Sequence, residues 1–146
     1  MIELGVGMDD SGGLKVGAIS VGDSSLANAA GVDRRVVRNA VKQILNDSDL
    51  KAIFTNVKPI GTSLVDVAKQ FGYSVLVVNA DPHRPGVISG ISTILSKYDV
   101  VIRQALADDP DFTPNPVLTL VIDGQVPSEA LSMIRSLKLV KSLTLK

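Results

Sequence analysis

The sequence lacks cysteine and tryptophan and contains a single histidine, His83. Without cysteine, the chain has no disulfide, no thiolate zinc site and no cysteine nucleophile. One histidine is too few for a multi-histidine metal site, and three Phe and two Tyr residues are too few for the platforms that stack single-stranded nucleic acid. Nucleophile-elbow and phosphate-loop motifs are also missing. We therefore expect no metal, no cofactor and no catalytic residue, and hence a protein that is not an enzyme.

The chain also lacks a long apolar run and an excess of charge of either sign. No run approaches the length of a membrane span, and residues 1–4 do not have the basic start of a signal peptide. Fifteen basic and fifteen acidic side chains give a net charge of zero, which argues against a protein that coats nucleic acid or anionic membrane. Apolar residues make up 45% of the 146 residues, enough for a real core. We expect a cytoplasmic protein without a membrane partner.

Residues 1–72 predict a small, mainly helical segment. Residues 2–6 and 14–21 can pair as a hairpin around a turn at 10–13, although the many glycines weaken both strands. Capping side chains at Asp23 or Ser24, Asp33 and Asp47 mark helix starts. The predicted helices cover residues 23–30, 34–45, 48–54 and 63–71.

Residues 23–45 resemble a helix-turn-helix, with a short helix, a Gly31-Val32 turn and a capped basic helix. In such a unit Arg34, Arg35 and Arg38 would face phosphates or bases. Residues 14–71 carry eight basic and five acidic residues, a net charge of +3. The alternative is a plain helical hairpin whose basic face is solvated, so DNA is a candidate partner only.

Residues 73–146 read as strand, helix, strand, strand, helix, strand. This order predicts an α+β fold in which a four-stranded antiparallel sheet carries both helices on one face. An acidic turn at residues 108–116 joins the two middle strands. We interpret it as a solvated turn, because the glycine and final glutamate of a calcium loop are missing. The predicted elements cover residues 74–79, 86–98, 100–107, 117–122, 127–137 and 139–145.

Two of these strands, at 75–78 and 117–122, are apolar at nearly every position. Strands of this kind are buried on both faces, whereas two helices cover only one face of a four-stranded sheet. The second face therefore needs a cover, either from another subunit or from the N-terminal helices. We expect a homo-oligomer, at least a dimer.

The loop before the first helix of this region is the candidate binding site. The backbone N–H groups of Gly86, Val87 and Ile88 lie at a helix N-terminus, which attracts carboxylate or phosphate. Pro85 fixes the entry of the chain into the helix, and Arg84 or His83 can add a donor. The alternative is a plain Pro-Gly turn before a helix, with His83 as a solvated loop residue.

The same loop resembles that of the ACT domain, a small βαββαβ module. The resemblance rests on Arg84-Pro85-Gly86-Val87 between strand and helix, on residues 100–104 in the second strand and on the terminal strand. It implies a ferredoxin-like sheet over residues 73–146 that senses an amino acid. The ligand would sit between the loop of one chain and the second strand of a neighbour. The family usually has an acid directly before Arg-Pro-Gly; here His83 stands there, and Asp81 lies two positions earlier. The implied ligand-binding residues are Asp81, His83, Arg84, Pro85, Gly86, Val87, Ile88, Ile102, Arg103 and Gln104.

The whole chain is similar to a group of archaeal predicted regulators of amino-acid metabolism that join a helix-turn-helix segment to an ACT domain. The resemblance implies an allosteric regulator whose small-molecule effector, an amino acid, changes how the N-terminal segment acts in transcription. The alternative is an ACT module that does not bind DNA and instead regulates an enzyme partner or mediates assembly.

Overall fold

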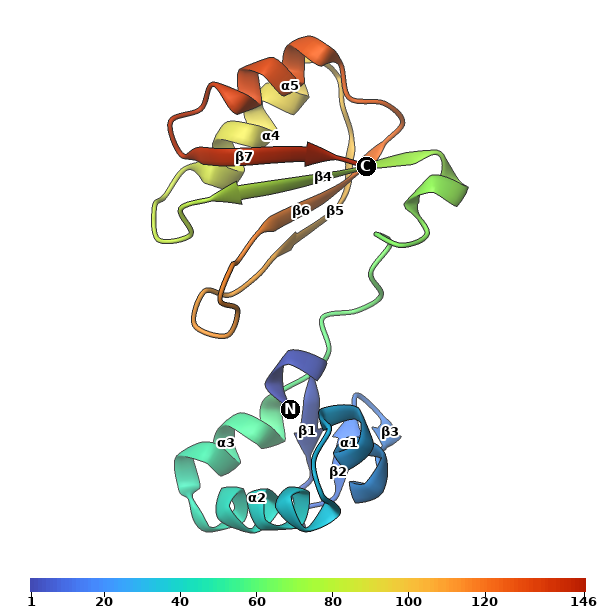
Figure 1. Cartoon of the computed structure of the whole chain (residues 1–146), viewed down its shortest axis with the longest axis vertical. Helices are drawn as coiled ribbons and strands as arrows, with labels where there is room; N and C mark the ends of the chain where they lie inside the picture. The colour runs from blue at the N-terminus through green and yellow to red at the C-terminus, as the bar shows by residue number, and fades with distance from the viewer. The chain divides into compact units, whose positions relative to one another are not determined.

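The computed structural model describes residues 1–146, the side chain of Glu3 excepted, and has a mixed α+β architecture (Figure 1). The described residues form two antiparallel sheets and five α-helices. The chain divides into two compact units, Met1–Thr62 and Ser63–Lys146. Residues 63–72, which the sequence assigned to the N-terminal segment, thus pack with the second unit. Within the described chain no helix has both the length and the apolar character needed to cross a bilayer.

The first unit begins with a short sheet in the order β1-β2-β3. Its strands are β1 (Val6–Met8), β2 (Leu14–Val16) and β3 (Ile19–Ser20). The predicted hairpin is confirmed in its turn, but residues 2–4 form a 3-10 helix, so that β1 starts where the prediction ends it. The predicted strand 14–21 is two strands, because Gly17 turns the chain with a φ of +59°.

Asp9 holds the turn between β1 and β2. Its Oδ1 accepts hydrogen bonds from the Ser11 hydroxyl at 2.6 Å, the Gly13 N–H at 2.8 Å and the Ser11 N–H at 2.9 Å. These bonds, the one from the Ser11 hydroxyl above all, hold the pKa of Asp9 below its ordinary value of 3.8. The turn is therefore fixed by side-chain chemistry that glycine-rich strands alone do not provide.

Three helices follow, α1 (Asp23–Ala30), α2 (Arg34–Asn46) and α3 (Ser48–Asn56). The predicted caps at Asp33 and Asp47 are confirmed: Asp33 Oδ1 accepts from the Arg35 N–H at 2.7 Å, and Asp47 caps α3. The predicted cap at Asp23 or Ser24 is wrong: α1 covers the predicted residues 23–30, but Gly22 is its N-cap and no side-chain cap bond forms. Gly31 ends α1 with a φ of +65°.

The core of the first unit joins the sheet to α1 and α2. Strands β1 and β2 therefore provide the packing that a helix before the predicted helix-turn-helix would otherwise supply. The buried side chains of this core are Val6, Met8, Leu14, Leu26, Ala27, Val37 and Ile44.

The second unit is a four-stranded antiparallel sheet in the order β5-β6-β4-β7. The elements follow one another as strand, helix, strand, strand, helix and strand, and their ends lie within two residues of the predicted ones. The elements are β4 (Tyr73–Ala80), α4 (Val87–Lys97), β5 (Ile102–Ala107), β6 (Leu118–Asp123), α5 (Ser128–Arg135) and β7 (Val140–Leu145).

Both helices pack on one face of this sheet (Figure 1). The side chains of β4 and β6 alternate, so that Leu76 and Leu120 face the helices while Val75 and Val121 face the other way. The core between sheet and helices includes Leu76, Val78, Ile91, Leu95, Leu118, Leu120, Ile122, Ala130 and Ile134.

A segment of the same chain covers part of the other face. Residues 63–72, which we call the strap, place Leu64, Val65 and Ala68 against Val75 and Val121. The side-chain oxygen of Gln104 on β5 accepts the Leu64 N–H at 2.9 Å and fixes the start of the strap.

The helix predicted at residues 63–71 is therefore wrong: only Ala68–Phe71 is helical, and it is a 3-10 turn. Packing on the sheet overrides the helical spacing, which two β-branched valines already weaken. The sequence allowed either another subunit or the N-terminal helices as the cover of this face. Part of the N-terminal segment covers Val75 and Val121, but as a strap and not as a helix.

Replacing Ala68 with aspartate tests the strap. Ala68 is buried against the sheet, so a carboxylate there must either lose its hydration or release the strap. We expect the free energy of unfolding to fall by about 1–3 kcal/mol, with faster hydrogen exchange at the Leu64 amide. Gln70→Asp introduces the same charge at an exposed strap position and should change stability by less than about 0.5 kcal/mol. Equal effects of the two substitutions would contradict the packing of the strap.

Candidate functional site

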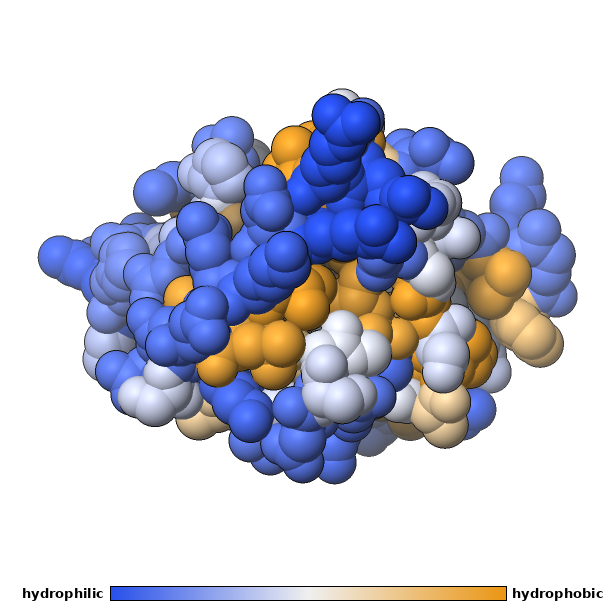
Figure 2. Space-filling model, turned by 90° about the horizontal axis from the view of Figure 1, so that it is seen from below, coloured by the Kyte–Doolittle hydropathy of each residue, from blue (hydrophilic) through white to orange (hydrophobic). Residues whose placement is uncertain are grey.

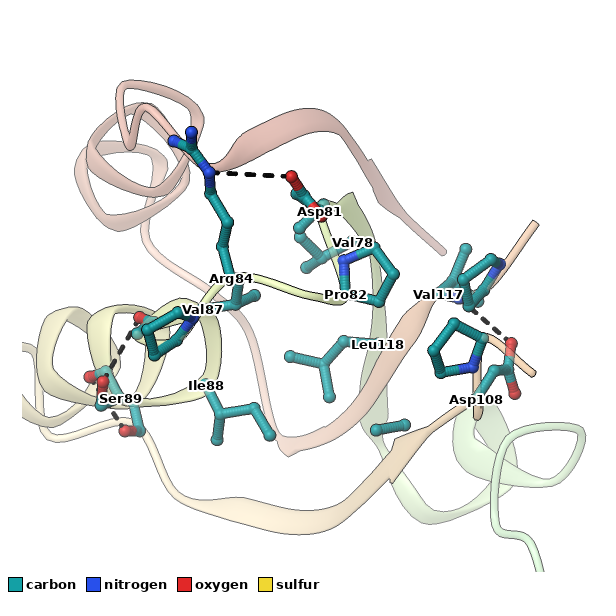
Figure 3. Close-up of a pocket in the computed structure, with 17 residues that line it drawn as sticks. Val78, Asp81, Pro82, Arg84, Val87, Ile88, Ser89, Asp108, Val117 and Leu118 are labelled. Atoms are coloured by element: carbon teal, nitrogen blue, oxygen red, sulfur yellow. Dashed lines mark hydrogen bonds and ion pairs between the residues drawn. The ribbon is translucent and has the colours of Figure 1, made fainter. Parts of the chain in front are cut away.

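The loop between β4 and α4 is folded around Asp81. One carboxylate oxygen of Asp81 accepts the His83 N–H at 3.1 Å, and the Asp81 carbonyl accepts the Arg84 N–H at 3.3 Å. The other carboxylate oxygen lies 3.8 Å from Nε of Arg84. Asp81 thus turns the chain and also brings one negative and one positive side chain together at the end of β4 (Figure 3).

The start of α4 has backbone donors without a side-chain cap. Gly86 is the N-cap with a φ of +102°, and it makes no side-chain cap bond. The N–H groups of Val87 and Ile88 lie in the first turn, where the helix has no earlier carbonyl to accept their hydrogen bonds. They therefore point out of the helix end. This is an arrangement that favours an anionic group.

A cavity of about 620 Å³ lies between this loop and the β5–β6 hairpin. Its volume falls in the range typical of small-molecule sites. Figure 3 shows Leu118 in the middle of the cavity, with Ile88 on the α4 side and Val117 on the hairpin side. The lining residues are Val78, Ala80, Asp81, Pro82, Arg84, Pro85, Gly86, Val87, Ile88, Ser89, Ser92, Ala107, Asp108, Pro110, Pro116, Val117 and Leu118.

Polar side chains of the cavity already have partners inside the protein. Besides the Asp81–Arg84 pair, Oδ2 of Asp108 accepts the Val117 N–H at 3.1 Å. The hydroxyls of Ser89 and Ser92 donate to helix carbonyls at 3.3 and 3.1 Å. These polar side chains are thus held in place by hydrogen bonds and an ion pair within the protein.

The structure brings six of the ten residues predicted for the ligand site to this cavity. They are Asp81, Arg84, Pro85, Gly86, Val87 and Ile88. His83 instead lines an adjoining hollow of about 410 Å³, together with Asn79, Asn115 and Lys141, and the two hollows share Asp81 and Pro82 in their linings.

The three residues predicted on the second strand lie outside the cavity lining. Ile102 packs against the core between sheet and helices. Arg103 lies 3.8 Å from Asp123 and 5.4 Å above the ring of Tyr73. Gln104 binds the strap. Because the sequence placed these three residues against the loop of a neighbouring chain, that contact stays a prediction.

Sequence reasoning missed the half of the cavity that comes from strand interiors and from the hairpin. Val78 and Leu118 read as core, and Ala107 as an ordinary strand residue. Asp108 was part of a turn interpreted as solvated. The available signal was the proline pair Pro110 and Pro116, which stiffens the hairpin beside the loop.

The three arginines predicted for DNA binding do not share one environment. Arg34 and Arg35 are exposed in the first turn of α2. Nε of Arg38 is 2.9 Å from Oδ2 of Asp23 in α1, so this arginine ties the two helices together. Elsewhere in the described chain, no group of three or more His, Cys, Asp or Glu residues is close enough to hold a metal ion.

Replacing Gly86 with alanine tests whether the start of α4 requires a positive φ at this position. An added Cβ would lie 3.8 Å from the Leu139 side chain, an ordinary contact, so the cost of Gly86→Ala comes from its positive φ. We expect a loss of about 1–3 kcal/mol in the free energy of unfolding, measured by urea denaturation. Gly90→Ala, inside α4, is the control: its Cβ would contact Leu137 at 3.4 Å, and we expect no loss. A Gly86→Ala variant as stable as the unmodified protein would contradict this conformation.

A scan of the chain against family models found no match, and a search of curated proteins found no matching sequence.

Proposed function

We propose that the protein is a regulator whose second unit binds a small metabolite, an amino acid, through a ferredoxin-like module of the ACT type. The element order β4-α4-β5-β6-α5-β7 and the sheet order β5-β6-β4-β7 support this proposal. In a split βαβ arrangement of this kind, two strands joined by a helix do not pair with each other: β6 lies between β4 and β5, and β4 lies between β6 and β7. The resemblance of the Arg84-Pro85-Gly86-Val87 loop then points to the end of β4 as the binding region.

The observation that carries the proposal is the cavity beside this loop. Six residues chosen from the sequence for a binding role line one hollow of about 620 Å³. The Asp81–Arg84 pair offers one charge of each sign, which matches the ammonium and carboxylate of a free amino acid. Uncapped N–H groups at the start of α4 add donors for the carboxylate.

We propose binding without catalysis. Acid–base chemistry needs a group that is free to gain and lose a proton beside the substrate. In the cavity, the carboxylates of Asp81 and Asp108 accept bonds from the backbone, and His83 lines the other hollow. These groups are suited to hold a ligand in place.

The homo-oligomer also remains a proposal. Strands β5 and β7 each have one neighbour in the sheet, so each has an unpaired edge at which a second chain can add. A ligand that binds two arrangements of such an assembly unequally would shift the balance between them.

A binding screen of the full-length protein with the twenty amino acids tests the function. An amino acid at 100 times its dissociation constant should raise the free energy of unfolding by about 2.7 kcal/mol, seen as a thermal shift. Ala107→Trp should abolish that shift, because Ala107 is exposed in the cavity wall and a tryptophan there fills the hollow.

Ala105→Trp is the matched control for this screen. Ala105 is also exposed, lies two residues earlier on the same face of β5, and is outside the cavity lining. A shift with no amino acid, or one that both tryptophan variants abolish alike, would refute binding in this cavity.

DNA binding by the first unit is a second candidate, favoured by one observation. Arg34 and Arg35 occupy the first turn of α2, where the helix dipole disfavours positive charge and where no acidic residue is present. The N-cap carboxylate of Asp33 offsets part of this positive charge, and a phosphate at the same helix end would offset the rest. The apolar Val32 and Val36 beside them are 40% and 53% exposed. Figure 2 views the molecule from below relative to Figure 1 and shows hydrophobic residues gathered among hydrophilic ones on that face.

Charge removal at Arg34 and Arg35 separates this candidate from its alternative. If the unit binds DNA, Arg34→Ala with Arg35→Ala should weaken binding of duplex DNA and reduce the salt slope of the affinity by about 2. Lys58→Ala with Lys69→Ala removes the same charge outside α2 and should leave the slope unchanged. Absence of DNA binding by the unmodified protein would favour an ACT module that acts on an enzyme partner or in assembly.

A further inference from the structure

Most of the cavity lining is apolar, apart from charged groups at two places and the Ser89 and Ser92 hydroxyls, which are bonded to carbonyls at the start of α4. Its floor and walls are hydrocarbon, with Val78 and Leu118 below and Val87, Ile88 and Ala107 at the sides. Charged side chains are confined to the Asp81–Arg84 pair at the loop and to Asp108 at the hairpin. Figure 3 shows the start of α4, with Val87 and Ile88, and Asp108 on opposite sides of the hollow, with Leu118 between them and the Asp81–Arg84 pair at the upper rim.

Prolines limit the backbone donors of the cavity to one end. Pro82, Pro85, Pro110 and Pro116 all line it, and proline has no N–H. The Val117 N–H, next to Pro116, is already bonded to Asp108. The donors left for a ligand are therefore the Arg84 guanidinium and the N–H groups at the start of α4, both beside Asp81. A carboxylate can be met only at this end.

Asp108 sets the electrostatics of the opposite end. Its carboxylate accepts the Val117 N–H, and the backbone N–H of Asp108 donates to the Val117 carbonyl at 3.1 Å. An anionic group brought toward it would meet a like charge across an apolar surface that provides no donor, and such an encounter is unfavourable. The far end thus accepts a neutral hydrocarbon end and rejects an acid.

We infer that the ligand is an α-amino acid with an apolar side chain, and that Asp108 is the residue that excludes acidic amino acids. This inference rests on the proposed function. The ligand carboxylate is held by Arg84 and the start of α4, its ammonium by Asp81, and its side chain lies over Leu118 toward Asp108. Burial of hydrocarbon supplies the preference for a longer side chain.

Calorimetric titration of the full-length protein with leucine, alanine, glutamate and 4-methylpentanoate tests this class. We expect leucine to bind roughly tenfold or more tightly than alanine, because three further carbons leave water. Glutamate and 4-methylpentanoate, which lacks the ammonium, should bind at least about tenfold more weakly than leucine, about 1.4 kcal/mol in free energy.

Asp108→Asn should raise the affinity for glutamate relative to leucine by about tenfold, since the amide oxygen still accepts the Val117 N–H while the charge is gone. Asp111→Asn removes a charge from the same hairpin outside the cavity lining and should leave the ratio unchanged. Equal binding of glutamate and leucine by the unmodified protein, or an unchanged ratio in Asp108→Asn, would overturn the inference.

The two proposals fail in different ways. If a polar or acidic amino acid binds tightly and Ala107→Trp abolishes its binding, the proposed function stands and the apolar class is wrong. If no amino acid binds, or binding survives Ala107→Trp, the proposed function is wrong and the ligand class falls with it.

Discussion

Strands β4 and β6 must bury both of their faces, and the second unit is arranged around that constraint. Leu120 and Val121 are neighbours on β6 that point to opposite faces, with exposed fractions of 2% and 0%. The helices α4 and α5 shield the first of them, and the strap shields the second. An apolar side chain of this size gains about 1.5–3 kcal/mol from burial, so neither face can be left to water without a large loss.

The cavity exists where that cover ends. Helices α4 and α5 meet the sheet over its central strands, whereas the edge strand β5 presents small, exposed alanines on the same face. Ala80 and Ala107 are too short to fill the space between the start of α4 and the hairpin. Pro82, Pro85, Pro110 and Pro116 stiffen the chain around this space. The hollow is thus a product of packing, and the Asp81 loop is held beside it because β4 is fixed on both faces.

The sequence predicts the elements of the second unit well, because alternating or continuous apolar residues give strands and the Pro-Gly pair gives a helix start. It also predicts the loop half of the cavity. It could not predict the hairpin half, since Ala107 and Asp108 reach the loop only through the pairing of β5 with β6. The strap failed for a related reason: Leu64, Val65 and Ala68 have a spacing that suits a helix, but contact with Val75 and Val121 decides their conformation. Likewise, the tie between Arg38 and Asp23 depends on how two helices pack.

The strap also sets the length of chain between the two units. Pro59 packs closely on Gly5 in the first unit: a Cβ added to Gly5 would lie 2.9 Å from the Cα of Pro59. In the second unit, the Leu64 N–H is bonded to Gln104. Five steps of chain separate these points, a reach of at most about 17 Å. If the strap left the sheet, the connection would extend to Tyr73, with a reach of about 48 Å. The effective concentration of one unit around the other would then fall, because it decreases steeply with tether length. The bond from Leu64 to Gln104 and the apolar contacts of the strap therefore limit the length of free chain between the two units.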